Sequence, residues 1–243
     1  MTESLANNGR RVWAVVAARS GSKGLSNKNI RSLAGTPLIS HSIRFALKTG
    51  FFERVMLTTD SAEYAAIGEQ HGAWVPFLRS PEAAADTSME EHILEDMDRQ
   101  LAQHGITPPD AIVWFRPTFP FRAIADLRTA LDLLDDDVDA VRLVVEGEPR
   151  LYTLTDGYLN PTFDDGGRSM IRRQEFKPVY KVFHTDIFWY RNIKLGVKFL
   201  GDRVRGVPVH KICGIDVDSI EDFELAEAII QAGATSAQRY INP

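Results

Sequence analysis

Residues 12–29 read VWAVVAARSGSKGLSNKN, an apolar run that leads directly into a loop of small and cationic residues. The run over residues 12–18 predicts a buried strand. In the loop, glycines and serines let backbone N–H groups approach an anion closely, and Arg19, Lys23 and Lys28 supply positive charge. The stretch therefore predicts a phosphate-binding loop at the end of a strand, as in an enzyme that uses a nucleotide.

The spacing within this loop differs from that of two common nucleotide motifs. It lacks the Gly-x-Gly-x-x-Gly spacing of dinucleotide-binding folds and the Gly-Lys-Ser/Thr sequence of a P-loop. A plain turn rich in glycine and serine is the alternative, but such a turn has no need of three cations beside Asn29.

The composition is that of an ordinary globular domain. The chain has 243 residues, of which 44% are hydrophobic and 25% charged, with a net charge of −5. This length permits one large α/β domain or one domain with a small appendage, and the charge predicts no nucleic-acid polymer as partner. We expect a single domain over residues 11–235. With one cysteine, Cys213, and neither a membrane-spanning run nor a signal sequence, we expect no membrane association and a cytoplasmic location.

Strand and helix patterns alternate along most of the chain. This alternation predicts an α/β fold with a mostly parallel sheet and helices on both faces. Apolar runs predict strands at residues 12–18, 54–59, 74–77, 111–115, 140–145 and 179–191, with another strand end at 214–219. Helical spacing predicts helices at residues 37–48, 61–71, 88–104, 124–134 and 220–230.

Polar residues follow three of these strands. They are the loop of residues 19–29, Asp60, and residues 116–122. Ligands of parallel α/β sheets bind at the carboxyl ends of the strands, so we expect these three segments to share one crevice. For Asp60 itself, we favour a structural role as the cap of the following helix.

The alternation of strand and helix patterns stops at about residue 146. Asp156-Gly157 predicts a hairpin turn, and residues 164–167, Asp-Asp-Gly-Gly, predict a further turn. The segment of about residues 146–190 is therefore expected to be an insertion, either a dimerisation arm or a lid.

A pair of aspartates near the carboxyl end has two interpretations. In an extended strand, Asp216 and Asp218 point to the same face and can share a Mg²⁺ ion. Either aspartate can alternatively cap the helix that follows, for which Ser219 and Asp222 also form a capping pattern. His184, surrounded by aromatic residues, is either a site residue or a buried, hydrogen-bonded imidazole.

The motifs together resemble those of the acylneuraminate cytidylyltransferases, also called CMP-sialic acid synthetases. The matching residues run in the family's order over nearly the whole chain: residues 19–29, Thr58-Thr59-Asp60, Arg79 with Glu82, Asp86 and Thr87, Pro117-Thr118 with Pro120 and Arg122, Arg173-Gln174, and Ile215-Asp216 with Asp218, Glu221 and Asp222.

The resemblance implies a Rossmann-like nucleotide-sugar transferase fold, usually dimeric through an inserted dimerisation segment. It implies a nucleotidyltransferase of the EC 2.7.7 type that joins CTP to an acidic 2-keto-3-deoxy sugar and releases pyrophosphate. The matched positions imply three sets of site residues. Triphosphate and nucleotide contacts would come from Ala18, Arg19, Ser22, Lys23, Gly24, Lys28, Asn29, Arg79 and Asp86. The catalytic Mg²⁺ would be bound by Asp216 and Asp218, and the acid sugar by Arg116, Thr118, Phe119, Arg122, Arg173, Phe183 and His184.

Two departures fall where the acceptor should bind. The family motif Gln-Pro-Thr-Ser-Pro-Leu-Arg reads Arg-Pro-Thr-Phe-Pro-Phe-Arg at residues 116–122, and an Asn-Gly pair is replaced near Phe183-His184. Arg116 indicates an acceptor with extra negative charge, or one whose carboxylate sits differently. A nonulosonic acid, an octulosonic acid and a phosphonate all stay open as acceptors, and a non-catalytic nucleotide-binding module is the alternative to an enzyme.

Overall fold

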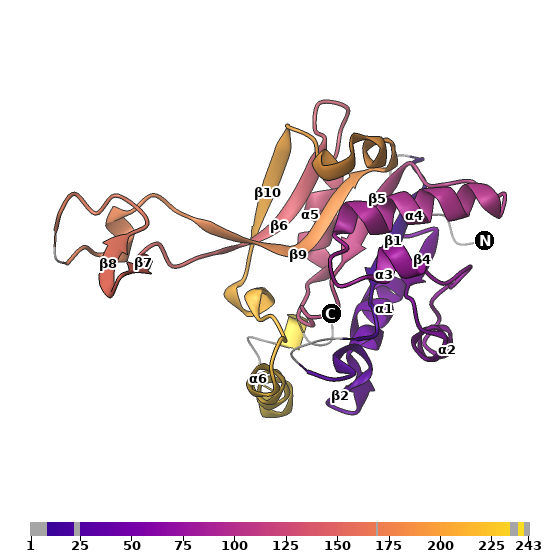
Figure 1. The fold of residues 1–243 in the computed structure, drawn as a ribbon, viewed down its shortest axis with the longest axis horizontal. Helices are drawn as coiled ribbons and strands as arrows, with labels where there is room; N and C mark the ends of the chain where they lie inside the picture. The colour runs from indigo at the N-terminus through magenta and orange to yellow at the C-terminus, as the bar shows by residue number, and fades with distance from the viewer. Residues whose placement is uncertain (1–8, 22–24, 169, 234–237, 241–243) are drawn as a thin grey trace.

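One six-stranded sheet forms the centre of the protein (Figure 1). The computed structural model describes residues 9–21, 25–168, 170–233 and 238–240. The strand order is β10-β6-β9-β5-β1-β4, and every pair is parallel except the two that β9 makes with β5 and β6. The strands are β1 (Val12–Ala17), β4 (Arg54–Thr58), β5 (Ala111–Phe115), β6 (Ala140–Glu146), β9 (Tyr180–Trp189) and β10 (Val204–Val209).

Helices cover both faces of this sheet, as predicted. One face carries α1 (Leu38–Thr49), α2 (Ala62–Gln70) and α5 (Ile124–Asp132), and the other carries α4 (Glu90–Gln103) and the 3-10 segment η3 (Tyr190–Lys198). The shorter elements are η1 (Lys28–Ile30), β2 (Ser32–Leu33), β3 (Thr36–Pro37), α3 (Pro81–Ala84), η2 (Arg173–Glu175) and η4 (Lys211–Gly214), and α6 (Ile220–Ala232) comes last. Among the described residues, none of the helices combines the length and apolar character that crossing a bilayer requires.

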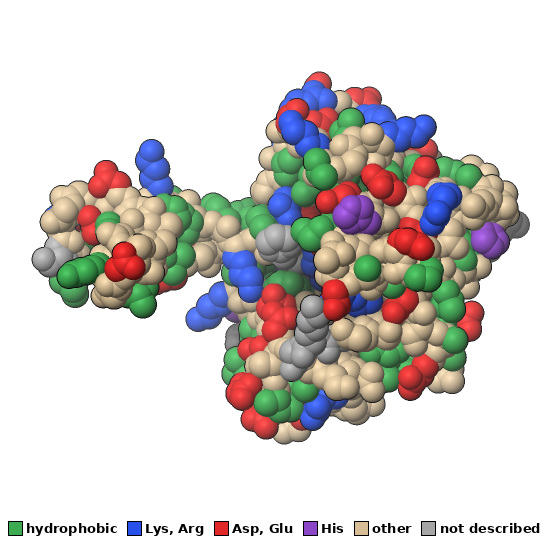
Figure 2. Space-filling model, in the orientation of Figure 1, with side chains coloured by type: hydrophobic (Ala, Val, Ile, Leu, Met, Phe, Trp, Pro, Cys, Tyr) green, Lys and Arg blue, Asp and Glu red, His purple; other side chains and the backbone are tan. Residues whose placement is uncertain are grey.

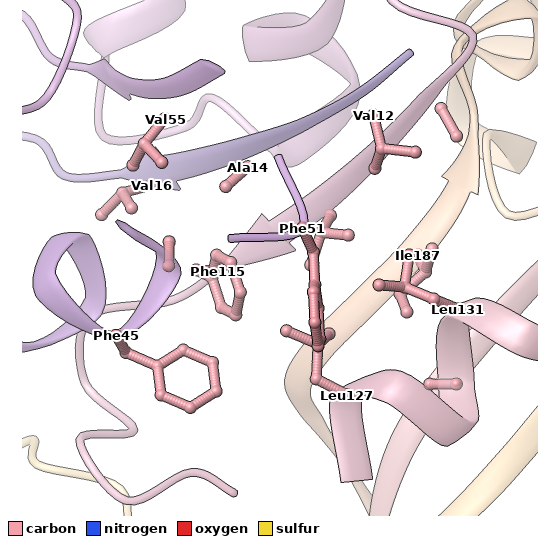
Figure 3. Close-up of a cluster of buried hydrophobic side chains, with 14 of the residues drawn as sticks. Val12, Ala14, Val16, Phe45, Phe51, Val55, Phe115, Leu127, Leu131 and Ile187 are labelled. Carbon is pink, nitrogen blue, oxygen red and sulfur yellow. The ribbon is translucent and has the colours of Figure 1, made fainter. Parts of the chain in front are cut away.

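Two hydrophobic cores follow from the alternation of side chains along the strands. In β1, Val12, Ala14 and Val16 point toward α1 and α5, where Figure 3 shows them with Phe45, Phe115 and Leu127. Trp13 and Val15 point to the opposite face and pack with residues of α4. Because both faces of β1 are buried, its sequence is continuously apolar, and this is why its position is evident from sequence.

Three of the predicted strands differ from the structure. Residues 74–77 form only a single bridge, between Trp74 and Met56. Residues 215–218 join no sheet among the described elements, because Val217 N–H donates instead to the carbonyl of Thr118. The strand at 179–191 does form, as β9, but it runs antiparallel to its neighbours, and β10 was not predicted.

An arm leaves the body after β6 and returns at β9, as the left side of Figure 1 shows. Its tip is the predicted hairpin of β7 (Tyr152–Thr155) and β8 (Tyr158–Pro161). Asp156 and Gly157 have φ of 50° and 82°, the left-handed values that a two-residue hairpin turn of this type requires. The arm thus occupies most of the predicted insertion, while the end of that segment belongs to the central sheet.

Candidate functional site

A crevice of about 540 Å³ opens at the carboxyl ends of β1 and β5, where the sequence predicted that polar strand ends would meet. Its walls come from the loops after these strands, from the start of α4 and from the segment before α6. The lining residues are Ala17, Arg19, Lys28, Asn29, Arg79, Ser88, Met89, Glu90, Ile93, Trp114, Arg116, Pro117, Thr118 and Asp218.

The loop after β1 is held from both sides. Asp60 accepts hydrogen bonds from the backbone N–H of Ser20 at 2.8 Å and from its hydroxyl at 2.6 Å. The buried Asn29 side chain donates to the carbonyl of Arg19 at 3.0 Å. Asp60 therefore positions the loop and is not the helix cap that we expected, since Ser61 caps α2. The predicted residues Ser22, Lys23 and Gly24 lie outside the described residues.

Two cations at this loop are paired with acidic residues from other elements. Arg19 Nη1 lies 3.0 Å from Asp86 Oδ1 and also donates to the carbonyl of Ala85. Lys28 Nζ lies 2.8 Å from Asp218 Oδ1. These ion pairs connect the loop to the segments before α4 and α6, so the predicted nucleotide residues converge from three parts of the sequence. Ala18 continues β1 with a backbone hydrogen bond to Thr58.

Arg79 is buried against the end of β4. Its Nε donates to the hydroxyl of Thr58 at 3.0 Å and its Nη2 to the carbonyl of Thr58 at 2.8 Å. Burial lowers the pKa of this guanidinium to about 10, so the group is still charged at neutral pH. Arg79 is thus a fixed cation in the wall of the crevice.

Asp218 lines the crevice, and Asp216, two residues earlier, lies beside it without being part of the lining. Asp216 accepts a hydrogen bond from the Thr118 side chain and lies 3.7 Å from Lys181 Nζ. Burial raises the pKa of Asp216, and the nearby charge of Asp218 raises it further. Neither aspartate caps α6, because Ser219 and Asp222 form its capping box.

This pair of carboxylates fits a divalent cation. The two carboxylates lie near enough for the charge of Asp218 to raise the pKa of Asp216, and oxygen donors are the ligands that Mg²⁺ prefers. Among the described residues, no group of three or more His, Cys, Asp or Glu side chains is placed to hold a metal. An ion here would therefore complete its coordination with oxygens of a bound phosphate or water, as is usual for magnesium.

A line of four charges begins in the crevice wall, which Glu90 and Arg116 line, and continues into the protein. Arg116 contacts Glu90 at 3.0 Å and Asp186 at 2.9 Å, and Asp186 also accepts from Arg142 at 2.7 Å. Asp186 is fully buried in β9, directly opposite Arg142 of β6 in the sheet register. The sequence analysis did not predict Glu90, Asp186 or Arg142 as site residues. Asp186 could have been recognised, because it is the one acidic residue within the aromatic strand β9. Within this line of four side chains, Asp186 and Glu90 together balance the charges of Arg116 and Arg142.

Phe119, Arg122 and His184 lie together beneath this wall, buried and away from the crevice lining. Arg122 donates to the Ser42 hydroxyl and to the carbonyl of Arg116, and burial lowers its pKa to about 9. His184 Nε2 pairs with the carbonyl of Phe121 at 3.0 Å, which assigns the proton to Nε2. Burial lowers the pKa of His184 to about 3, so the imidazole is neutral. These three predicted acceptor residues therefore lie behind the crevice wall and do not line the crevice.

Two predicted acceptor residues are placed differently. Arg173 lies at the base of the arm, where it contacts Glu146 Oε1 at 2.8 Å and the carbonyl of Gly147. There it lines a separate pocket of about 300 Å³ and does not line the crevice. The side chain of Phe183 lies outside the described part of the chain.

The family model described as Cytidylyltransferase matches residues 13–137, just over half of the chain. The chain belongs to the cytidylyltransferase family. It is 41% identical over 123 residues to the CMP-N,N'-diacetyllegionaminic acid synthase of Legionella pneumophila, covering 51% of this chain and 53% of the relative. It is 32% identical over 231 residues to the N-acylneuraminate cytidylyltransferase of Escherichia coli, covering 91% of this chain and 52% of the relative. The chain thus spans about half of the length of these relatives.

The same fold occurs in a solved structure. A CMP:2-keto-3-deoxy-manno-octonic acid synthetase complexed with CTP matches with a TM-score of 0.69 at 17% identity, covering 92% of this chain and 99% of that one. At this identity the likeness concerns the fold, and it agrees with the predicted nucleotide-sugar transferase architecture.

Proposed function

We propose that this chain is a Mg²⁺-dependent cytidylyltransferase that transfers CMP from CTP to an acidic 2-keto-3-deoxy sugar and releases pyrophosphate. The observation that carries this proposal is the convergence of Arg19, Lys28, Asn29 and Arg79 on one crevice with Asp218 at its mouth. Membership of the cytidylyltransferase family and the names of the relatives support the choice of CTP and of an acidic sugar. A cytoplasmic location belongs to the same proposal.

The cations of the crevice have a direct role in this reaction. A sugar hydroxyl attacks the α-phosphorus of CTP, and the bond to the pyrophosphate oxygen breaks. Negative charge grows on the leaving pyrophosphate, and groups already fixed in place stabilise it most effectively. Arg19 and Lys28 are held by ion pairs with Asp86 and Asp218, so the protein itself fixes the positions of both cations. The cytosine would lie near Asn29 and Arg79.

Asp216 and Asp218 would hold the magnesium ion. When bound, Mg²⁺ supplies charge neutralisation to the phosphates. Thr118 fixes Asp216 by a side-chain hydrogen bond, and its backbone carbonyl accepts from Val217 between the two aspartates. The Asp216 carboxylate and the backbone between the two aspartates are therefore attached to the loop after β5, whereas the Asp218 carboxylate pairs with Lys28.

The experiment that tests this function is an assay of pyrophosphate release. CTP, UTP, ATP and dTTP are each supplied with Mg²⁺ and with a panel of acidic acceptors: N-acetylneuraminate, pseudaminate, legionaminate, an octulosonic acid and simple phosphonates. We expect release with CTP and at least one sugar acid, and loss of release on addition of EDTA. Binding of CTP without turnover of any acceptor would instead favour a nucleotide-binding module.

We further propose that the arm joins two copies of the chain as a homodimer. Leu154, Tyr158 and Leu159 are exposed on the hairpin, and Figure 2 shows hydrophobic side chains on its surface well away from the body. An exposed cluster of large apolar side chains is typical of an interface. Sedimentation equilibrium should give a dimer for the wild type and a monomer for the Leu154→Lys/Leu159→Lys variant. A monomeric wild type would contradict this part of the proposal.

A further inference from the structure

The carboxylate of Glu90 is bound to the guanidinium of Arg116, and both residues line the crevice. Arg116 Nε lies 3.1 Å and Nη2 3.0 Å from a single oxygen of Glu90, Oε1. The remaining nitrogen, Nη1, donates to Asp186 at 2.9 Å. Glu90 thus covers the Nε/Nη2 edge of the guanidinium, an edge that can bind a carboxylate through two parallel hydrogen bonds.

The two acidic partners of Arg116 differ in how easily they can leave. The Asp186 carboxylate is 0% exposed and is shared with Arg142, so removing it from Arg116 would leave buried charge without compensation. The Glu90 side chain is 29% exposed, begins α4 and lines the crevice. Glu90 is therefore the partner that a ligand can replace, because it can turn into water at little cost.

Charge balance gives the chemistry of the replacing group. Arg116 and Arg142 together carry one positive charge more than Asp186, and Glu90 brings the cluster to neutrality. One carboxylate entering from the crevice restores this neutrality after Glu90 has turned away. It can also give one oxygen to each N–H of the edge, whereas Glu90 gives one oxygen to both.

We propose that Glu90 holds the place of the acceptor's carboxylate on Arg116 and is displaced when the acceptor binds. The inference rests on the proposed function and deepens it, because it assigns the acceptor's carboxylate to Arg116 and makes Glu90 a specificity-determining residue. The Nε/Nη2 edge of Arg116 accepts one carboxylate group and no additional negative charge. Glu90 also lowers the affinity for anions in general, so that an acceptor must offer better geometry than the protein's own side chain.

The test is a comparison of Glu90→Gln with Glu91→Gln. Both residues lie in the first turn of α4, so both variants lose the same favourable charge at the helix N-terminus. Glu90→Gln removes a charged competitor at a partly exposed site, and we expect the KM for the acceptor to fall about fivefold while the KM for CTP is unchanged. Glu91→Gln should leave both constants unchanged. An acceptor KM that is unchanged or raised in Glu90→Gln overturns the inference.

A binding measurement separates this inference from the proposed function. Calorimetry with N-acetylneuraminate should show about fivefold tighter binding to Glu90→Gln than to the wild type. With the uncharged methyl ester of the same sugar, the two proteins should not differ. Equal binding of the acid to both proteins, or binding to neither, overturns the role of Glu90. Absence of pyrophosphate release from the wild type with every acceptor would instead contradict the proposed function.

Discussion

The two halves of the crevice are built in different ways. The part that we propose binds CTP, here called the nucleotide half, is a loop whose short links, from Ser20 to Asp60 and from Asn29 to Arg19, lie close to β1. The part that we propose binds the acceptor, here called the acceptor half, is a line of charges in which Glu90, Arg116, Asp186 and Arg142 come from α4, the end of β5, β9 and β6. The loop of residues 19–29 is a contiguous motif that the sequence displays, whereas the line of charges exists only after the sheet has formed.

Substitution of one aspartate of the Asp216–Asp218 pair tests whether the nucleotide half needs these carboxylates in addition to its cations. In Asp216→Asn one carboxylate charge of the proposed metal-binding pair is lost, and we expect kcat to fall about 10²- to 10³-fold. Pyrophosphate release at saturating CTP and acceptor measures this change. Asp202→Asn, which alters an exposed carboxylate paired with Lys198, is the control and should retain full activity. A kcat of Asp216→Asn close to that of the wild type would remove this pair as the metal site.

Removal of the buried Asp186 charge in β9 tests whether the acceptor half also stabilises the fold. Asp186→Asn leaves Arg116 and Arg142 without their buried counter-charge, and we expect the free energy of unfolding to fall by about 3 kcal/mol. Urea denaturation measures this value. Glu146→Gln, which breaks an exposed pair with Arg173, should change it by under about 0.5 kcal/mol. Similar losses of unfolding free energy in the two variants would mean that the buried ion pairs of Asp186 contribute no more to stability than the exposed pair of Glu146.

The imidazole beneath Arg116 makes stability depend on pH. The pKa of His184 is about 3 in the folded protein, and about 6.5 in an unfolded chain. Between these values the unfolded chain binds a proton that the folded protein excludes, so stability falls as the pH drops below 6.5. At pH 5.5 we expect a loss of about 1.4 kcal/mol from this group. Urea denaturation at pH 8 and 5.5 should show a loss that is about 1.4 kcal/mol smaller in His184→Gln than in the wild type and in His71→Gln.

The anchor of the phosphate loop provides the smallest expected effect. Asp60→Ala removes both hydrogen bonds to Ser20, and we expect the KM for CTP to rise about fivefold because the loop is less ordered. Ser61→Ala removes the neighbouring cap of α2 and should lower stability by about 1 kcal/mol without changing that KM. If Ser61→Ala raises the KM as much as Asp60→Ala, the effect is general loosening and not the loop anchor.

Local signals predicted a large part of this protein. The apolar run of β1, the Asp156-Gly157 turn and the capping box of Ser219 and Asp222 each depend on residues within a few positions of one another. The placement of β9 between β5 and β6 depends instead on residues far apart in the sequence, because Asp186 pairs with Trp114 and with Arg142 across the sheet. The segment of Asp216 and Asp218 has the composition of a strand end, but a backbone hydrogen bond to Thr118 fixes it without a sheet.

The position of β9 also bears on how the chain folds during synthesis. β5 and β6 flank β9, and both emerge from the ribosome before it, with the arm between β6 and β9. Until β9 is made, β5 and β6 each present an unpaired strand edge, and such edges pair readily with other chains. The nascent protein is therefore at its most aggregation-prone while the arm is being translated, and chaperone protection should matter most in that interval.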